Sequence, residues 1–379
     1  MGPGHTDRTE PLYRPILQGG RGELDALGHL DGSSVPLLTP LLEIPAGRTA
    51  PDIAADLRAR LPGGLVVGVD PGGVPDPDLA RWGVPLLPVI GLAESDQRLA
   101  RHGEASRAWF RRAVVRLRAR SDRGGPDAAT GSVERIWRLT GLVPEQCDLV
   151  IDLADVCCAA DVRTAEPRAR RLVGWAHRHA WRSVTVTAGA MPPTLGMLPT
   201  DEAARLPRWD WLLWQRLADL RVDFGDYGVR SALPTFDVPA DRLPTMAYTA
   251  EETWWIYRWS RRGGRGDHRF TDLCRTLVSA PYWPPAGAGF SWGDHEILRR
   301  ARHAAGPGST SNWTAWSTSH HLAQVLTDLR RPATPGRQPG PGSESPGVRR
   351  SGDGRPGRQA TRGGRFSWPP RGGEDRRAG

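Results

Sequence analysis

The sequence predicts an α/β fold of the (β/α)8 barrel class, followed by a helical extension and a disordered tail. Eight short apolar runs rich in Val, Ile and Leu lie within the first 230 residues, and longer amphipathic stretches separate them. Strands that are apolar on both faces and alternate with helices pair in parallel through right-handed crossovers. Eight such units in a chain of this length are typical of a TIM-like barrel.

The pattern defines each element in turn. The expected strands are residues 13–17, 36–44, 65–70, 85–92, 113–119, 149–154, 183–188 and 220–224, each a short apolar run. The expected helices between them are residues 22–30, 51–61, 76–82, 96–110, 132–142, 166–181 and 209–218. A doubly wound open sheet is the alternative architecture, but no GxGxxG motif follows the first strand.

Composition divides the chain into four segments. Residues 1–12 are polar and expected to be disordered, and residues 13–234 form the barrel. Residues 235–331 are expected to be a helical extension packed on the barrel, because 250–330, including "EETWWIYRWS", is rich in tryptophan at helical spacing. Residues 332–379 are dominated by Pro, Gly, Ser and Arg, so they bury too little apolar surface to fold.

Charge and hydropathy limit the classes of partner. The net charge is +9, but from Arg331 onward there are 11 arginines and four acidic residues, so +7 belongs to the tail. The nucleic-acid signal is therefore weak and confined to the Arg-rich tail. No apolar run approaches the length of a membrane span, and the start lacks the apolar centre of a secretory signal. A cytoplasmic protein with no membrane partner is expected.

A series of short motifs carries a family resemblance. These are "YRPILQGGRGELDAL" (13–27), "PLLEI" (40–44), "VVRLR" (114–118), "LVIDLAD" (149–155), "TAGAMPPTLG" (187–196), "LPRWDWLLW" (206–214), "FGDYG" (224–228), "WGDHEI" (292–297) and "SHHL" (319–322). In order and spacing, they resemble the beta protein family of phages and bacteria. The chain departs from the family at Ala190, Asp210 and Ala247, where serine, glutamate and arginine are expected. The resemblance implies a barrel-like domain. A binding protein that acts in phage–host conflict is the first of two functions considered for it.

The ends of the strands supply the candidate site residues, because barrel chemistry lies at the carboxyl ends of the strands. Three acids, Glu43, Asp70 and Asp152, directly follow apolar strands, where a buried charge must be paired or bound to metal. Converging carboxylates suit a divalent metal such as Mg²⁺, whereas Arg116 suits phosphate. The structural alternative is that these acids cap helices and pair with arginines. The remaining candidates are Glu23, Asp226, Tyr227 and His320.

The stretch "RVDFGDYGVRSALP" (221–234) closes the eighth expected strand. Asp223 and Gly225 are interpreted as turn residues, whereas Asp226 and Tyr227 are expected at the barrel mouth.

Two functions remain open. One is a scaffold that binds a protein or nucleic-acid partner. The other is an enzyme that uses a carboxylate and arginine mouth on a phosphorylated or nucleotide-like substrate.

Deleting residues 335–379 is expected to leave the melting temperature within about 2 °C of the full chain, because the segment adds no apolar core. Calorimetry of both proteins measures this. A larger drop would mean that Phe366 or Trp368 docks on the folded part.

Overall fold

The computed structural model describes residues 12–45, 47–72, 74, 78–119, 125–233, 243–261 and 268–331. The predicted disordered tail, all of the N-terminal segment except Leu12, and the predicted domain boundary at residue 234 lie outside the described residues. Within those ranges, no helix is both long and apolar enough to cross a membrane.

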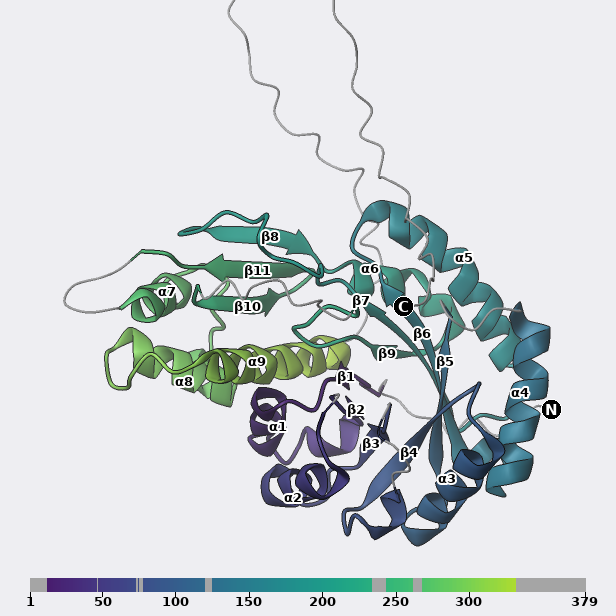
Figure 1. Cartoon of the computed structure of the whole chain (residues 1–379). Helices are drawn as coiled ribbons and strands as arrows, with labels where there is room; N and C mark the ends of the chain where they lie inside the picture. The colour runs from purple at the N-terminus through teal and green to yellow at the C-terminus, as the bar shows by residue number, and fades with distance from the viewer. Residues whose placement is uncertain are drawn as a thin grey trace, which may run out of the picture. The chain divides into compact units, whose positions relative to one another are not determined.

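Eight parallel strands form one barrel (Figure 1). They are β1 (Ile16–Leu17), β2 (Leu41–Glu43), β3 (Val67–Asp70), β4 (Leu86–Gly91), β5 (Ala113–Arg118), β6 (Cys147–Asp155), β7 (Ser183–Gly189) and β9 (Asp223–Gly225). Each overlaps a predicted strand. The sheet closes where Tyr13 bridges Phe224 and the Arg14 amide donates to the Phe224 carbonyl at 2.9 Å. The predicted barrel is confirmed, and the open sheet is excluded.

Helices cover the outside of the barrel. They are α1 (Arg21–Gly28), α2 (Ala50–Arg60), α3 (Asp96–Ala108), α4 (Gly125–Thr140), α5 (Ala159–Ala176) and α6 (Trp209–Arg216). Thr49 and Ser95 begin α2 and α3 by accepting a hydrogen bond from the third amide of each helix. The helix expected at 76–82 is shorter than predicted, because the part described there forms only the 3-10 turn η2 (Leu79–Arg81).

Inside the barrel, the side chains form three layers. At the amino ends of the strands, the fully buried Arg14 donates to Asp148 at 2.9 Å, and Arg112 donates to the other oxygen of this carboxylate at 2.9 Å. The middle layer is apolar, and its members include Ile16, Leu41, Leu87, Val89, Val114 and Val150. The third layer, at the carboxyl ends, surrounds Arg116. Because alternate residues of an extended chain share a face, Arg112, just before β5, and Val114 and Arg116 within it contribute one residue to each layer.

A second group of elements, here called the accessory layer, packs beside the barrel (Figure 1). It comprises β8 (Ala203–Pro207), β10 (Thr245–Ala250), β11 (Thr253–Arg258), α7 (Arg269–Val278), α8 (Trp292–Ala301) and α9 (Thr310–Arg330). The strands form an antiparallel sheet in the order β10-β11-β8. The chain enters this layer after β7 and again after β9, on the mouth side of the barrel. In α1, Gly22 lets α9 approach closely, because a Cβ there would lie 2.4 Å from the Ser311 carbonyl oxygen.

The structure corrects two predictions from the sequence. The prediction that 250–330 is helical is wrong at its start, because "TWWIYR" (253–258) forms β11. Trp254 and Ile256 are buried and Trp255 is less so, which is the alternation of a strand rich in aromatic residues. The interpretation of Asp223 and Gly225 as turn residues is also wrong. Both belong to β9, where a Cβ on Gly225 would meet the Thr187 hydroxyl at 2.1 Å.

Candidate functional site

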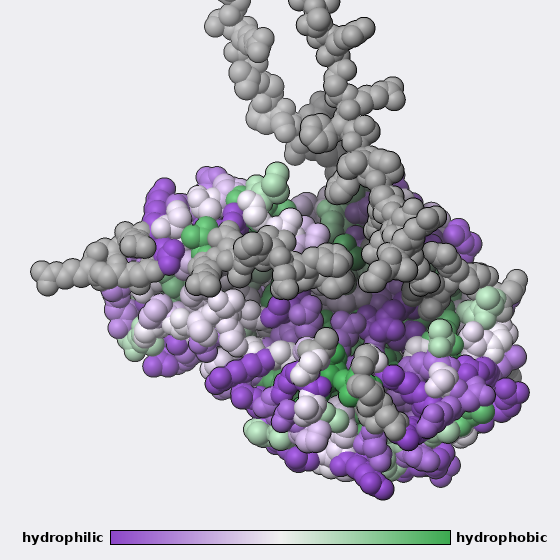
Figure 2. All heavy atoms as spheres, in the orientation of Figure 1, coloured by the Kyte–Doolittle hydropathy of each residue, from purple (hydrophilic) through white to green (hydrophobic). Residues whose placement is uncertain are grey.

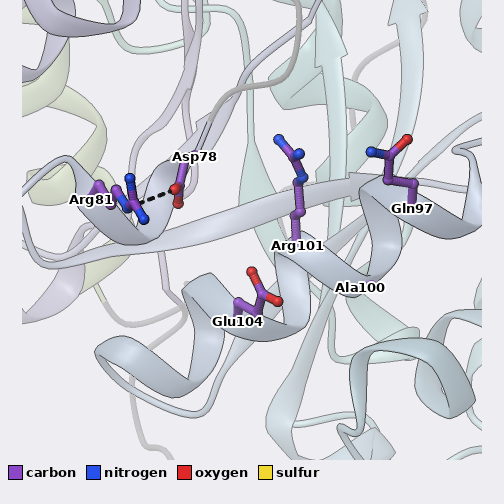
Figure 3. Close-up of a pocket in the computed structure, with 6 residues that line it drawn as sticks. All are labelled: Asp78, Arg81, Gln97, Ala100, Arg101 and Glu104. Atoms are coloured by element: carbon purple, nitrogen blue, oxygen red, sulfur yellow. Dashed lines mark ion pairs between the residues drawn. The ribbon is translucent and has the colours of Figure 1, made fainter.

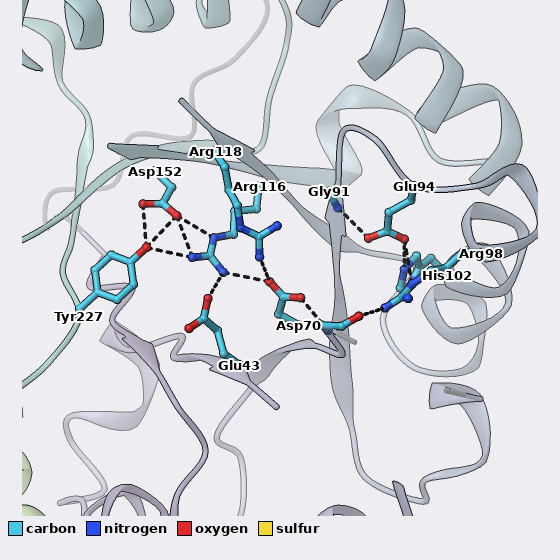
Figure 4. A network of polar contacts seen from close by, with 11 residues as sticks. Glu43, Asp70, Gly91, Glu94, Arg98, His102, Arg116, Arg118, Asp152 and Tyr227 are labelled. Atoms are coloured by element: carbon cyan, nitrogen blue, oxygen red, sulfur yellow. Dashed lines mark hydrogen bonds and ion pairs between the residues drawn. The ribbon is translucent and has the colours of Figure 1, made fainter. Parts of the chain in front are cut away.

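The third layer of the barrel interior, here called the mouth network, is centred on Arg116 (Figure 4). Its Nη1 donates to Glu43 at 2.6 Å and to Asp70 at 2.9 Å. Its Nε and Nη2 donate to one oxygen of Asp152 at 3.0 and 2.7 Å, and Nη2 also donates to the Tyr227 hydroxyl at 3.0 Å. These contacts use the five donors of the guanidinium, so Arg116 ties together β2, β3, β6 and the segment after β9.

Asp152 is held from several sides. Its oxygens accept from the Tyr227 hydroxyl at 2.8 Å, and one also accepts from the Ala154 amide at 2.9 Å. Ala154 has a φ of 59°, and the register of β6 against β7 shifts between Asp152 and Asp155. A left-handed alanine stores about 1–3 kcal/mol of strain, and a bulge redirects a strand at its end. The backbone after β6 is therefore shaped around the Asp152 carboxylate.

The pKa shifts in the mouth network follow from burial and its charges. Burial alone would lower the pKa of Arg116, but the negative charges around it, with Asp152 foremost, hold its pKa well above the usual value. Burial raises the pKa of Tyr227 far above its usual value, and Asp152 raises it further. At neutral pH, Tyr227 therefore keeps its proton and donates a hydrogen bond to Asp152.

Only part of the mouth network reaches solvent. The Arg116 and Asp152 side chains are 2% and 3% exposed, whereas the side chains of Glu43 and Arg118 are 34% and 40% exposed. Arg118 donates to Asp70 at 2.5 Å, next to the contact that Asp70 makes with Arg116. Three carboxylates and two guanidiniums give the network a formal charge of −1, with Glu43 and Arg118 at its surface.

The geometry also bears on the expected divalent metal. Among the residues that the structure describes, no group of three or more His, Cys, Asp or Glu side chains is arranged to hold a metal ion. Glu43, Asp70 and Asp152 do converge, as predicted, but the Arg116 guanidinium lies between them, where a cation would have to bind. The three carboxylates therefore fit a buried guanidinium and not a metal ion.

The mouth network brings together five residues predicted from the ends of the strands, namely Glu43, Asp70, Arg116, Asp152 and Tyr227. Asp70 also has the predicted turn role, because its second oxygen accepts from the Gly72 amide at 3.1 Å. Glu23 lies apart from this network. It is buried at the start of α1, accepts from the Gly20 amide and lies 3.3 Å from Arg230.

Asp226 lies in the contact between the barrel and the accessory layer, whereas His320, the other remaining candidate, lies within the accessory layer. Asp226 accepts from the Tyr13 hydroxyl at 2.7 Å and lies 2.8 Å from Nε2 of His321. His320 points the other way along α9 and contacts Asp294 at 2.9 Å. Adjacent residues on a helix diverge by about 100°, so one histidine faces the barrel and the other faces α8. Neither Asp226 nor His320 contacts the mouth network.

Arg208 is a buried cation that the sequence interpretation missed. Its side chain is fully buried, and its Nη2 lies 3.8 Å from Asp210 and 3.7 Å from Asp226. The guanidinium packs over Trp211, with its carbon 5.1 Å from the ring centre. Nε and Nη2 of Arg208 and Oδ1 of Asp210 have no hydrogen-bond partner among the described residues. The motif "RWDWLLW" was visible, but nothing in one sequence indicated that its arginine faces Asp226.

The two acids beside Arg208 titrate differently. Burial raises the pKa of Asp210 to about 6, against the attraction of Arg208. Burial also acts to raise the pKa of Asp226, but His321 and Arg208 outweigh it and hold that pKa below its usual value. Both carboxyls are therefore mostly ionised at pH 7, and Asp210 is the one whose charge destabilises the fold.

A recess of about 520 Å³ lies on the outside of the barrel, between η2 and α3 (Figure 3). It is lined by surface side chains such as the ion pair of Asp78 and Arg81, at 3.1 Å, and by Gln97 and Glu104. These groups are solvated, so the recess offers no desolvated polar group for chemistry. Hydrophilic atoms also fill the recessed centre of the face in Figure 2, between the accessory layer and the barrel.

Comparison with known proteins identifies one family. The family model described as Beta protein matches residues 13–327. Triosephosphate isomerase from Bartonella henselae is among the similar solved structures, with 13% sequence identity, a TM-score of 0.31, and coverage of 57% of this chain and 91% of that one. That score is too low to carry an argument, and the barrel assignment rests on strand order. No curated protein matches the chain significantly.

The mouth network predicts that two substitutions lower the free energy of unfolding by different amounts. Arg116→Ala would leave three acids around a buried gap, so the free energy of unfolding is expected to fall by about 3–5 kcal/mol. Asp152→Asn keeps the shape and both Tyr227 and Arg116 as neighbours, so it is expected to cost less. Denaturant unfolding of both variants measures the difference. Equal losses would contradict the central position of Arg116.

Asp210→Asn is expected to stabilise the protein at pH 7 and not at pH 4. The folded-state pKa of about 6 exceeds the usual value of 3.8, so ionising Asp210 destabilises the fold as pH rises between these values. Asparagine carries no charge and can direct its amide oxygen to Arg208. Melting temperatures of wild type and variant across this range provide the measurement. A difference that stays constant with pH would refute the shifted pKa.

Proposed function

The chain belongs to the beta protein family, and we propose that its barrel is a ligand-binding module whose partner contacts the mouth network. This proposal rests on the three carboxylates around Arg116, which differ in how many hydrogen bonds restrain each of them. Asp152 accepts from Tyr227 and the Ala154 amide as well as from Arg116. Asp70 likewise accepts from Arg118 and the Gly72 amide. Within the described residues, Glu43 accepts only from Arg116, and it is the most exposed of the three.

Glu43 behaves in this proposal as an internal substitute for the ligand. An anionic group of a partner replaces it on Nη1 of Arg116, and the displaced carboxylate turns into solvent. The exchange conserves the charge around Arg116, so no buried cation is left unpaired. A guanidinium binds carboxylate and phosphate oxygens equally well in geometry, so the entering group belongs to a protein or to a nucleic acid. A partner in phage–host conflict is the first class to test.

The second candidate function is an enzyme acting on a phosphorylated or nucleotide-like substrate. The contact of the Tyr227 hydroxyl with Asp152, at 2.8 Å, favours it, because a phenol beside a carboxylate can pass a proton at the mouth. The binding role is favoured over it because both groups are almost fully buried and already bonded to each other and to Arg116.

The exchange of Glu43 is tested by thermal unfolding of wild type and Glu43→Ala in acetate, phosphate or chloride at matched ionic strength. In chloride, the variant is expected to be less stable, because Arg116 lacks one partner. Saturating acetate or phosphate is expected to restore it, since a ligand at 100 times its dissociation constant stabilises a fold by about 2.7 kcal/mol. Wild type should respond only at higher concentration, because the anion competes with Glu43.

Glu104→Ala is the matched control, because it removes one carboxylate from the exposed face of α3. It should respond to anions as wild type does. If acetate and phosphate stabilise Glu43→Ala no better than chloride does, the proposal that an anion replaces Glu43 on Arg116 is wrong. The enzyme is favoured if the protein releases inorganic phosphate from nucleoside triphosphates and Tyr227→Phe abolishes this release. In that case acetate and phosphate should still stabilise the Tyr227→Phe variant.

A further inference from the structure

Three loops meet at the end of the barrel opposite the mouth. They precede β5, β6 and β7, which are neighbours in the sheet, and they follow α3, α4 and α5 (Figure 1). Nη1 of Arg107 donates to the Thr140 carbonyl at 3.1 Å, which joins the ends of α3 and α4. The rings of Trp137 and His179, 5.5 Å apart, join α4 to the loop after α5. The loops therefore form one continuous surface.

This surface, here called the basic rim, carries five exposed arginines and two exposed acids, Glu145 and Glu134, of which Glu134 lies close enough to act electrostatically on His179. The arginines are Arg107, Arg111, Arg138, Arg178 and Arg182. Residues 1–330 as a whole carry a net charge of only +2. Positive charge at the ends of α3 and α4 stabilises helix dipoles, which accounts for Arg107 and Arg138. Arg111, Arg178 and Arg182 lie beyond the helices, so this explanation does not cover them.

The basic rim also exposes large apolar side chains. In the part of the chain that the structure describes, four large hydrophobic residues are exposed, and three of them lie here: Trp109 (37%), Phe110 (42%) and Val143 (51%). Exposed aromatic rings between arginines are unusual on a surface that only needs to be soluble. Flat rings beside guanidinium groups are the combination that binds the bases and phosphates of an unpaired strand.

Beneath the rim, two buried or half-buried arginines face two buried or half-buried carboxylates. Burial lowers the pKa of Arg112, and Arg182 and Arg14 lower it further, against the attraction of Asp148. Arg14 and Arg112 share the carboxylate of Asp148, and Arg14 also donates to Asp223 at 3.4 Å. These charges balance, so the positive charge of this surface comes from its exposed arginines.

We propose that the basic rim binds single-stranded nucleic acid, with its arginines on the phosphates and Trp109 and Phe110 stacked against bases. Charge complementarity and the exposed rings select this occupant over a double helix, whose bases are already stacked. The surface lies at the opposite end of the barrel from Glu43 and Arg118. It is thus separate from the proposed exchange at the mouth, and either can fail without the other.

The test uses the full chain and a labelled oligothymidylate of about 20 nucleotides, with binding followed by fluorescence anisotropy over a series of NaCl concentrations. Arg178→Ala with Arg182→Ala is expected to weaken binding roughly tenfold and to flatten the log–log salt slope by about 1.4, or about 0.7 for each phosphate that is no longer neutralised. Trp109→Ala is expected to weaken binding about five- to a hundredfold with little change in slope, because stacking carries no charge.

The matched control removes two exposed arginines from the outer face of α5, Arg163 and Arg168, by substitution to Ala. It keeps the Arg-rich tail and should bind as wild type does. An equal loss in this control, or no measurable binding by wild type, would overturn the proposal. If the arginine variant weakens binding but Trp109→Ala does not, and polyglutamate competes equally well, the rim recognises acidic protein instead. Unchanged melting temperatures confirm that each variant is folded.

Discussion

A buried guanidinium organises each end of this barrel. Arg116 binds three acids from three strands at the mouth, and Arg14 binds Asp148, Ser183 and Thr185 at the other end. A charge withdrawn from water is stable only when its partners surround it in good geometry. The strands must therefore adopt one register for either arginine to be satisfied. The apolar layer between the two arginines makes contacts that do not depend on direction. The two ends of the barrel therefore fix the register of the strands, and the apolar layer stabilises their packing.

The same constraint shapes the candidate site. An arginine whose donors are all used cannot serve as an open anion receptor, so any ligand must replace a group that is already bound. Glu43 is the group that the surroundings restrain least. Asp152 is restrained most, by Tyr227 and by the bent backbone at Ala154. A site built in this way is preorganised, because its cation is desolvated and oriented before the ligand arrives.

The barrel could be predicted from the sequence because its strands are apolar on both faces and its helices are amphipathic. The convergence of Glu43, Asp70, Arg116 and Asp152 was also predictable, since parallel strands bring their carboxyl ends to one rim. Pairing of these acids with arginines was expected only as the structural alternative. Nothing along the chain shows that Arg116 contacts all three acids at once, or that Arg208 lies beside Asp226. The strand β11 was missed because its tryptophans were interpreted by helical spacing rather than by alternation.

The accessory sheet is built from strands that are not all consecutive in the sequence. Its strand β8 precedes β9 in the chain, whereas β10 and β11 follow β9, yet β8 pairs with β11. In the sequence, the last barrel strand, β9, therefore lies between two strands that pair with each other in the accessory sheet. A growing chain cannot complete that sheet until β9 has emerged and the following hairpin has formed. Barrel closure and accessory-sheet formation are consequently coupled late steps, and partial synthesis would leave the edges of both β7 and β8 without their final neighbours.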